Sequence, residues 1–482
     1  MLFNSIDFAG FLPIVFVLYW FVANKNLKAQ NLLILIASYF FYGCWDWRFL
    51  SLILFSTLID YFVGLALNIS KNKNSKKMLL SLSVVVNLGL LCFFKYFNFF
   101  IDNFNAVFLL LGRPLGISSL NIILPVGISF YTFQTMSYTI DVYKNKIEPT
   151  KNFIAFAAFV AFFPQLVAGP IERAKNFLPQ FKKKRYFDYS RAVNGLKQVL
   201  WGLFKKMVIA DNCAVFVDDI FLNHTDYNGS TLLIGAFFFT IQIYCDFSGY
   251  SDIAIGVSRL FGFNLMKNFA FPYFSRNIKE FWRRWHISLT TWFKDYVYIP
   301  IGGSWGSKLM QARNTIFIFV IIGFWHGAHW KFIVYGLING LHFIPSIIKG
   351  KSKTYENVVA YKKIMPTTIE FMGMIKTFTF LVIVRVFFRA NSLSDAISYL
   401  SGIFSKSLFS VPNFGNRFMA LIVLILIMIF FLIEWLGRHD EYAIENLVDK
   451  RKPIYKWGVY YLLVFLIFYF SGEQQQFIYF QF

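Results

Sequence analysis

Residues 419–433 read MALIVLILIMIFFLI, fifteen consecutive apolar residues without a charge or a proline. A water-soluble helix carries polar side chains on its outer face, so this run is too apolar to form one. Similar apolar runs recur at residues 11–23, 31–42, 78–94 and 315–323. At roughly 20 residues for each membrane crossing, the whole chain would hold about ten to thirteen spans. We therefore expect an all-α polytopic membrane protein.

The overall composition agrees with this fold class. Of the 482 residues, 57% are hydrophobic and only 15% are charged, whereas an average soluble domain carries roughly 25% charged residues. The polar stretches are short, and no internal repeat or Pro/Ser-rich linker divides the chain. We expect one membrane-embedded domain over residues 1–482, whose last part, residues 471–482, is a C-terminal tail.

The excess of positive charge points to lipid rather than to nucleic acid. The formal net charge is +22, from 47 Lys and Arg against 25 Asp and Glu. Many of the cations cluster in short loops at residues 71–77, 182–185 and 349–363. The positive-inside rule and the attraction of anionic lipids account for such loops. They predict that these loops are cytoplasmic, that the lipid bilayer surrounds the chain, and that nucleic acid is not a partner.

The cysteines and histidines give little support to a metal site. The four cysteines stand singly, which indicates free thiols rather than disulfides. His326 and His329 are three positions apart, and a zinc site on them is one alternative. However, the nearest carboxylates in sequence are Asp295 and Glu356, and no His-Glu-x-x-His pattern occurs. The sequence also contains no glycine-rich loop of the kind that binds phosphate, and no nucleotide-binding motif. We therefore expect no metal and no permanently bound cofactor.

Three segments interrupt the apolar pattern with polar residues. Residues 162–173, FFPQLVAGPIER, contain two prolines and a glycine, which predict a helix end at the membrane interface. Residues 242–300 include YCDFSGYSD and FWRRWHISLT, which are too charged to face lipid. A basic interfacial helix is the alternative for this segment, with Trp282, His286, Leu289, Thr290 and Phe293 on one helical face. Residues 321–330, IIGFWHGAHW, place His326 in an apolar run.

The second and third segments each supply a histidine that suits proton transfer. His286 and His326 are separated by 326−286 = 40 positions, room for one span and its loop, so the two could meet in a shared cavity. Gly327 would let a ligand or another backbone approach the His326 imidazole. A neutral imidazole can take a proton from a hydroxyl, which can then attack a thioester. These residues permit acyl transfer to an alcohol, but they equally permit proton-coupled transport.

The order of the motifs resembles that of the membrane-bound O-acyltransferase family, in particular its bacterial branch with alginate O-acetyltransferase and the teichoic-acid D-alanyl transferase. The resemblance covers most of the chain, and the motifs are specific as a set rather than singly. The matching stretches are LPVGISFYTFQ at 124–134, FFPQLVAGPIER at 162–173, DFSGYSDIAIG at 246–256, FWRRWHISLTTWFKDYVYIPIGG at 281–303 and GFWHGAHW at 323–330.

This resemblance implies a fold, a reaction and a site. The fold would be a ring of transmembrane helices around a central funnel, with re-entrant or interfacial helices. His326 would be the catalytic base and His286 the second catalytic histidine. The donor would be a cytosolic acyl thioester such as acetyl-CoA, and the acceptor a hydroxyl of an exported cell-surface polysaccharide. A periplasmic or extracellular acetyltransferase partner would finish the transfer, and the chain would lie in a bacterial inner membrane.

The tail closes on FIYFQF, residues 477–482, with one hydroxyl on Tyr479. In the D-alanyl branch, a small separate membrane protein ends in a similar motif whose tyrosine is thought to carry the acyl group. The resemblance therefore implies that Tyr479 is a third catalytic residue, an acyl relay between thioester and acceptor. A phenol needs a base within hydrogen-bond reach to act as a nucleophile. The alternative is an interfacial belt of aromatic side chains.

Several rival functions remain at the level of the sequence. The chain could be a transporter or flippase for acyl groups or glycans, with the histidines as a proton relay, or a structural component that docks a secreted enzyme. D-alanyl transfer to teichoic acid is a further alternative, although the chain length and the GGS after VYIP favour the acetylating branch. The acceptor sugar, the donor-binding residues and the oligomeric state are not encoded in any motif.

Overall fold

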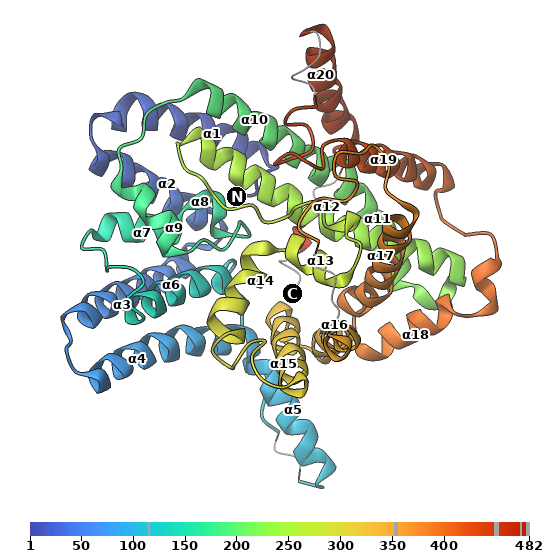
Figure 1. Cartoon of the computed structure of the whole chain (residues 1–482), viewed down its shortest axis with the longest axis horizontal. Coiled ribbons are helices and arrows are strands. Elements are labelled where there is room, and N and C mark those ends of the chain that lie inside the picture. Colours follow the sequence, from blue (N-terminus) through green and yellow to red (C-terminus); the bar gives the residue numbers. More distant parts are fainter. Residues whose placement is uncertain (114–115, 351–354, 448–452, 473–474, 479–482) are drawn as a thin grey trace. The chain divides into compact units, whose positions relative to one another are not determined.

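The computed structural model describes residues 1–113, 116–350, 355–447, 453–472 and 475–478. Every regular element in these ranges is helical, which confirms the predicted fold class (Figure 1). Within them, eight helical segments have the length and apolar composition needed to cross a membrane. This number is below the expected ten to thirteen, in part because two helices of 20 residues each form one continuous 43-residue segment, Leu27–Ile69.

The chain forms two compact units. Unit 1 comprises residues 1–195 and 257–266, and unit 2 comprises residues 196–256 and 267–482. The predictions of a single domain and of a ring of helices concern the whole chain and stay predictions. The helices that begin in unit 1 are α1 Ile6–Val17, α2 Leu27–Asp46, α3 Leu50–Ile69, α4 Lys73–Leu91, α5 Phe97–Leu110, α6 Ile128–Tyr143, α7 Phe153–Ala161, α8 Phe163–Leu166, α9 Ala174–Phe177 and α10 Tyr189–Leu203.

Unit 2 contains the long helix that carries the YCDFSGYSD motif. This helix, α12, runs for 32 residues and continues into the last part of unit 1. The helices that begin in unit 2 are α11 Asp211–Leu222, α12 Gly229–Leu260, α13 Ile278–Arg284, α14 Ile287–Phe293, α15 Lys308–His326, α16 Trp330–Lys349, α17 Thr368–Arg389, α18 Leu393–Ile403, α19 Arg417–Leu436 and α20 Pro453–Phe470. Four short π-helical segments extend regular helices, at Leu18–Val22, Cys92–Tyr96, Phe204–Ala210 and Lys294–Tyr298.

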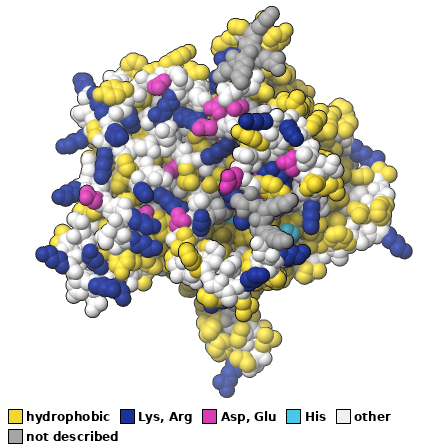
Figure 2. Space-filling model, in the orientation of Figure 1, with side chains coloured by type: hydrophobic (Ala, Val, Ile, Leu, Met, Phe, Trp, Pro, Cys, Tyr) yellow, Lys and Arg dark blue, Asp and Glu magenta, His cyan; other side chains and the backbone are white. Residues whose placement is uncertain are grey.

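The molecular surface shows the apolar and basic character expected of a chain in contact with lipid. Large apolar side chains such as Ile36, Phe62 and Val85 are exposed on the helices that could span the membrane. On the face drawn in Figure 2, Lys and Arg side chains are widely spread, and apolar side chains lie among them. Lipid tails and anionic headgroups are the natural neighbours of such a surface.

A buried polar cluster holds three helices of unit 1 together. Helices α3, α4 and α6 lie side by side (Figure 1). The Asp60 carboxylate of α3 accepts hydrogen bonds from Ser83 Oγ at 2.5 Å and from Asn87 Nδ2 at 2.8 Å, both on α4. Thr135 of α6 donates to Asn87 Oδ1 at 3.3 Å. A carboxylate in an apolar span is tolerated only with such partners inside the protein, so the cluster selects this helix arrangement.

The segment at residues 162–173 ends a helix, as predicted, but it does not lie at a surface. Helix α7 ends at Ala161, and residues 162–172 are buried within unit 1. The Glu172 carboxylate, 2% exposed, accepts a hydrogen bond from the Met266 backbone N–H at 2.5 Å. The position of this helix end at the membrane interface stays a prediction, and the proline-rich turn passes through the unit's interior.

Helices α15 and α16 of unit 2 approach each other closely through glycines. Figure 1 shows the two helices side by side. A methyl group added at Gly323 would lie 2.2 Å from the Phe332 carbonyl oxygen, and one added at Gly336 would lie 2.2 Å from the Phe319 carbonyl oxygen. Small residues allow this backbone contact between membrane helices. Because His326 is the last residue of α15, the contact also determines where its imidazole stands.

We predict that Gly336→Ala lowers the thermal stability of the purified protein in detergent. Overpacking of this kind costs about 1–3 kcal/mol, since the new methyl group meets backbone that cannot move aside. The matched control is Gly458→Ala on α20, where a methyl group would meet nothing within 4 Å. Glycine-to-alanine exchange at such an open helical position stabilises the helix. Equal melting temperatures for the two variants would contradict the predicted close contact.

Candidate active site

His286 stands at a sharp turn between two short helices. Helix α13 ends at Arg284 and α14 begins at Ile287, and His286 adopts the left-handed conformation with φ 45° and ψ 54°. Two backbone hydrogen bonds hold the turn, from Ile287 N to Asn268 O at 2.9 Å and from Ala270 N to Arg284 O at 3.0 Å. The predicted continuous helical face through Trp282, His286 and Phe293 is therefore wrong. A non-glycine residue in this region is strained, and such strain is characteristic of functional sites.

Asn268 determines which nitrogen of His286 is basic. Its Oδ1 accepts a hydrogen bond from Ser288 Oγ at 2.9 Å and lies 3.2 Å from His286 Nδ1, while its Nδ2 donates to Ser251 Oγ at 3.1 Å. Because Asn268 Oδ1 is an acceptor only, His286 Nδ1 carries the proton. The neutral imidazole then presents Nε2 as its basic nitrogen.

The surroundings of His286 favour its neutral form. The residue is 1% exposed, and its ring contacts that of Phe247 at a centroid distance of 4.6 Å. Burial, and in second place the neighbouring His326, lower the pKa of His286 well below its usual range. An uncharged imidazole is the form that can accept a proton at neutral pH.

His326 lies close to His286 through one shared aromatic side chain. The Trp325 ring lies 6.1 Å from the His286 ring and 5.0 Å from the His326 ring, measured between centroids. The Phe388 ring of α17 also packs against the His326 ring, with 5.1 Å between centroids. His326 is 5% exposed. The structure thus brings the two predicted histidines together in the interior of unit 2.

One expectation about the neighbours of His326 needs correction. The space beside Gly327 is filled by the Phe332 ring, which a methyl group there would meet at 2.2 Å, so it does not admit a ligand or another backbone. His329 is exposed and caps α16, accepting a hydrogen bond from Lys331 N at 3.4 Å. In the part of the chain that the structure describes, no group of three His, Cys, Asp or Glu side chains could hold a metal ion.

A large pocket opens beside the histidine pair. Its volume is about 780 Å³, within the range of ligand pockets, and neither imidazole lines it. Its wall includes Ile287, which follows His286 directly, and Ile322, one helical turn before His326. Gly350, in the loop predicted to be cytoplasmic, also lines it. This pocket lies adjacent to the histidines, and a cavity shared by the two imidazoles stays a prediction.

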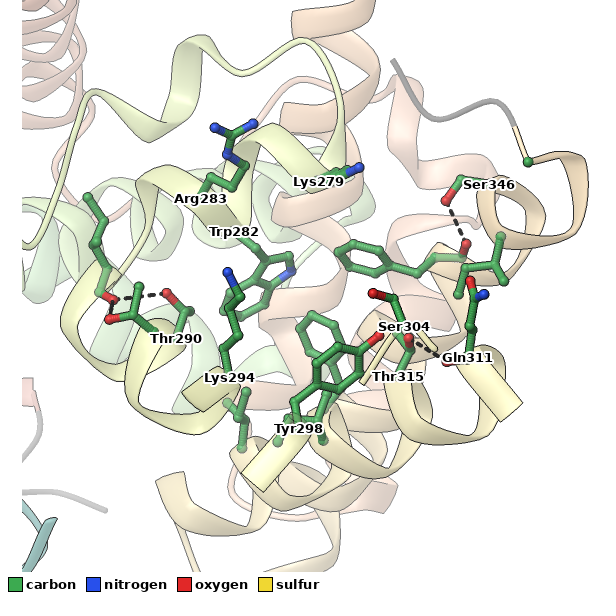
Figure 3. Close-up of a pocket in the computed structure, with 18 residues that line it drawn as sticks. Lys279, Trp282, Arg283, Thr290, Lys294, Tyr298, Ser304, Gln311, Thr315 and Ser346 are labelled. Carbon is green, nitrogen blue, oxygen red and sulfur yellow. Dashed lines mark hydrogen bonds between the residues drawn. The ribbon is translucent and has the colours of Figure 1, made fainter. Parts of the chain in front are cut away.

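The described lining of this pocket combines three cations with apolar and hydroxyl side chains, and it contains no carboxylate. Figure 3 shows Lys279 and Arg283 on α13 at one edge, and Lys294 extending beside the Trp282 indole. Arg283 and Lys294 are exposed. Tyr298, Ser304 and Thr315 lie on the opposite side (Figure 3). A cationic rim above an apolar interior suits an anionic ligand with a long uncharged arm.

The third predicted site residue, Tyr479, lies outside the described residues. The tail residues just before it are described, and Phe477 packs on Phe247, with 6.0 Å between ring centroids. Phe247 also contacts His286. The described part of the tail is thus separated from the histidine pair by one aromatic ring.

Reasoning from the sequence missed Asn268, because a single asparagine after MK and before FAFPY carries no periodic signal. It also missed the ion pairing of Lys206, whose only signal is a Lys-Lys pair inside an apolar run.

Comparison with known proteins places the chain in a family. The family model for membrane-bound O-acyltransferases matches residues 144–349, which include both histidines. The peptidoglycan O-acetyltransferase of Helicobacter pylori is 34% identical over 96% of this chain and 88% of its own length. A probable alginate O-acetylase of Azotobacter vinelandii is 39% identical over 82% of this chain and 76% of its own length.

A more distant relative represents the D-alanyl branch. The teichoic acid D-alanyltransferase of Bacillus subtilis is 29% identical over 46% of this chain and 58% of its own length. The near full-length similarity to the O-acetyltransferases, together with the buried histidine pair and the helical fold, leads to one assignment. The chain belongs to the membrane-bound O-acyltransferase family, as a multi-pass membrane enzyme of the O-acyltransferase class.

Proposed function

We propose that this enzyme moves an acetyl group from acetyl-CoA to hydroxyls of an exported cell-surface polysaccharide, from a bacterial inner membrane. The observation that carries the proposal is the pair of buried imidazoles around Trp325, beside a pocket with a cationic rim. The relatives named as alginate and peptidoglycan O-acetylating enzymes support an acetyl group and a glycan acceptor.

The pocket fits the donor by charge and shape. Lys279, Arg283 and Lys294 would bind the phosphates of acetyl-CoA at the rim. The uncharged arm would lie along the apolar interior towards Ile287 and Ile322, which neighbour the two histidines. Gly350 lines the pocket and lies in a loop predicted to be cytoplasmic, which supports a pocket mouth on the side from which a cytosolic donor would arrive.

The reaction needs a base and a hydroxyl. His326 takes the hydroxyl proton, the oxygen attacks the thioester carbonyl carbon, and the C–S bond breaks. The proton then passes from the imidazolium to the departing thiolate, so the products are free CoA and an acetyl ester. His286, with its proton on Nδ1 and Nε2 as its basic nitrogen, would orient a donor group of either substrate beside the base.

The first hydroxyl to receive the acetyl group would be that of Tyr479. The described tail residue Phe477 approaches the histidine pair through Phe247, which supports this role. A secreted acetyltransferase partner would then remove the acetyl group from the tyrosine and pass it to the polysaccharide. Tyr479→Phe deletes only the phenolic oxygen, and full acetyl transfer by that variant would rule out the relay.

We predict that His326→Ala and His326→Gln reduce acetyl transfer by about 100-fold or more, the usual contribution of a general base. The measurement is release of free CoA from acetyl-CoA by the purified protein, together with the acetyl content of the surface polysaccharide. The control is His329→Ser, which keeps a helix-capping side chain three residues away and should retain activity. Normal acetylation in a well-expressed His326→Ala variant would exclude His326 as the base.

We predict that the rate falls at acidic pH, which gives the pH–rate profile an acidic limb below about pH 6.5, the ordinary pKa of histidine. The rate falls with acid because the neutral imidazole is the active form. The lowered pKa of His286 keeps its imidazole neutral to lower pH. Asn268→Asp places a carboxylate beside Nδ1, favours the imidazolium and should move the limb upward by about one unit or more. Asn223→Asp adds the same charge at an exposed position and should leave the limb unchanged.

We predict that the double variant Arg283→Gln/Lys294→Gln raises the KM for acetyl-CoA about tenfold, while kcat changes less. Loss of phosphate contacts weakens ground-state and transition-state binding alike. The matched control, Arg283→Lys/Lys294→Arg, preserves both charges and should keep the KM within a small factor of the original. A KM that is the same for all three proteins would place the donor elsewhere.

A further inference from the structure

Phe477 and Ile478, at the end of the described part of the C-terminal tail, lie in the interior of unit 2. Phe477 and Ile478 are 3% and 1% exposed, as in a protein core, whereas chain ends are usually frayed. The Phe477 ring lies 5.1 Å from that of Tyr250 on α12, measured between centroids. Asn212 of α11 donates a hydrogen bond to the carbonyl of Phe470, the last residue of α20, at 3.2 Å. These contacts tie both the helix end and the tail to the same part of the unit.

A buried ion cluster faces the tail. Lys206 lies in the π-helical segment Phe204–Ala210, and its Nζ is 2.8 Å from Asp246 Oδ1 and 2.9 Å from Asp211 Oδ1. The same Nζ donates to the carbonyl oxygen of Gln475 at 3.2 Å. The Ile478 backbone N–H donates to Asp246 Oδ2 at 2.8 Å. Insertions of this π-helical kind in regular helices are frequent at functional sites.

The cluster is incomplete without the tail. A lysine ammonium has three donors, and here the two carboxylates accept two of them. The third goes to the Gln475 carbonyl, and the second oxygen of Asp246 is satisfied by the Ile478 N–H. Removal of the tail would leave a donor and a charged acceptor buried without these partners, which is strongly unfavourable. Lys206 and Asp246 therefore form a receptor for one backbone carbonyl and one backbone N–H three residues apart.

We propose that Lys206 and Asp246 are positioning residues that dock the tail of their own chain for the transfer reaction. This inference rests on the proposed function of Tyr479. The docked Ile478 immediately precedes Tyr479 in the sequence. Because Phe247 contacts both Phe477 and His286, docking keeps the described part of the tail one aromatic ring away from His286. The two residues touch backbone rather than reacting atoms, so they act through the tail.

The first test measures docking directly on the full-length protein in detergent. Deuterium uptake of the C-terminal peptide should be slow in the original protein and rapid in Lys206→Met and in Asp246→Ala. In the same variants we expect kcat for CoA release to fall by about 100-fold, as for a misplaced reacting group, with an unchanged KM for acetyl-CoA. Unchanged uptake in both variants would overturn the proposal, and so would rapid uptake with an unchanged kcat.

A second pair of variants avoids any change in the membrane helices. Ile478→Pro keeps an apolar side chain but removes the N–H that Asp246 accepts. Ile478→Ala keeps the N–H and loses apolar contact. If the backbone contacts dock the tail, Ile478→Pro should show rapid deuterium uptake in the remaining tail amides and a lower kcat. Ile478→Ala should change both quantities less. The reverse order of effects would show that apolar packing, and not the ion cluster, holds the tail.

The catalytic roles of His326 and Tyr479 and the docking of the tail can be disproved separately. If His326→Ala or Tyr479→Phe retains full activity, the proposed function of that residue is wrong, while deuterium uptake still reports whether the cluster docks the tail. If both variants are inactive but Lys206→Met leaves uptake and kcat unchanged, the catalytic proposal stands and the docking proposal is wrong. Both inactive variants should show the slow uptake of the original protein.

Discussion

A polar group that is removed from water in a membrane protein must find its partner inside the protein, and unit 2 is organised by that requirement. Helix α12 illustrates it, because successive polar side chains each meet a defined group. Ser251 accepts from Asn268, and Asp252 lies 2.5 Å from the Lys205 Nζ, which also donates to Ser248. These partners come from different segments, so satisfying them fixes where each segment lies along α12.

The geometry of the two histidines that we propose as catalytic depends on contacts of the same unit. The Nδ2 of Asn268 is held by Ser251 on α12. The Oδ1 of Asn268 fixes both the ring orientation and the tautomer of His286. On the other side, the backbone contact of α15 with α16 fixes His326. An imidazole positioned by its surroundings needs no rearrangement when the hydroxyl arrives, which is the general advantage of a preorganised site. The hydrogen bonds that satisfy the buried Asn268 therefore also orient His286, for which we propose a role in the reaction.

The sequence predicted the helical membrane fold and the pair His286 and His326, because apolar runs and isolated histidines are visible without any contact information. It did not predict the turn at Trp285 and His286, since the spacing of the aromatic residues fits one continuous helix. Nor could it identify Asn268, whose role depends on a contact 18 residues away. Periodicity describes the face of one element, whereas these features arise from tertiary pairing. The buried course of residues 162–172 was missed for the same reason.

The contact between Asp246 and the tail also has a consequence for biosynthesis. Its two partners, Asp246 and Ile478, are 232 positions apart. At a translation rate of roughly 5–20 residues per second, Asp246 is made about ten to fifty seconds before the residue that completes its cluster. During that interval the ion pairs of Lys206 with Asp246 and Asp211 are the part of the cluster whose residues have all been made. The hydrogen bond from Ile478 to Asp246 therefore forms late relative to the synthesis of the helices that carry the cluster.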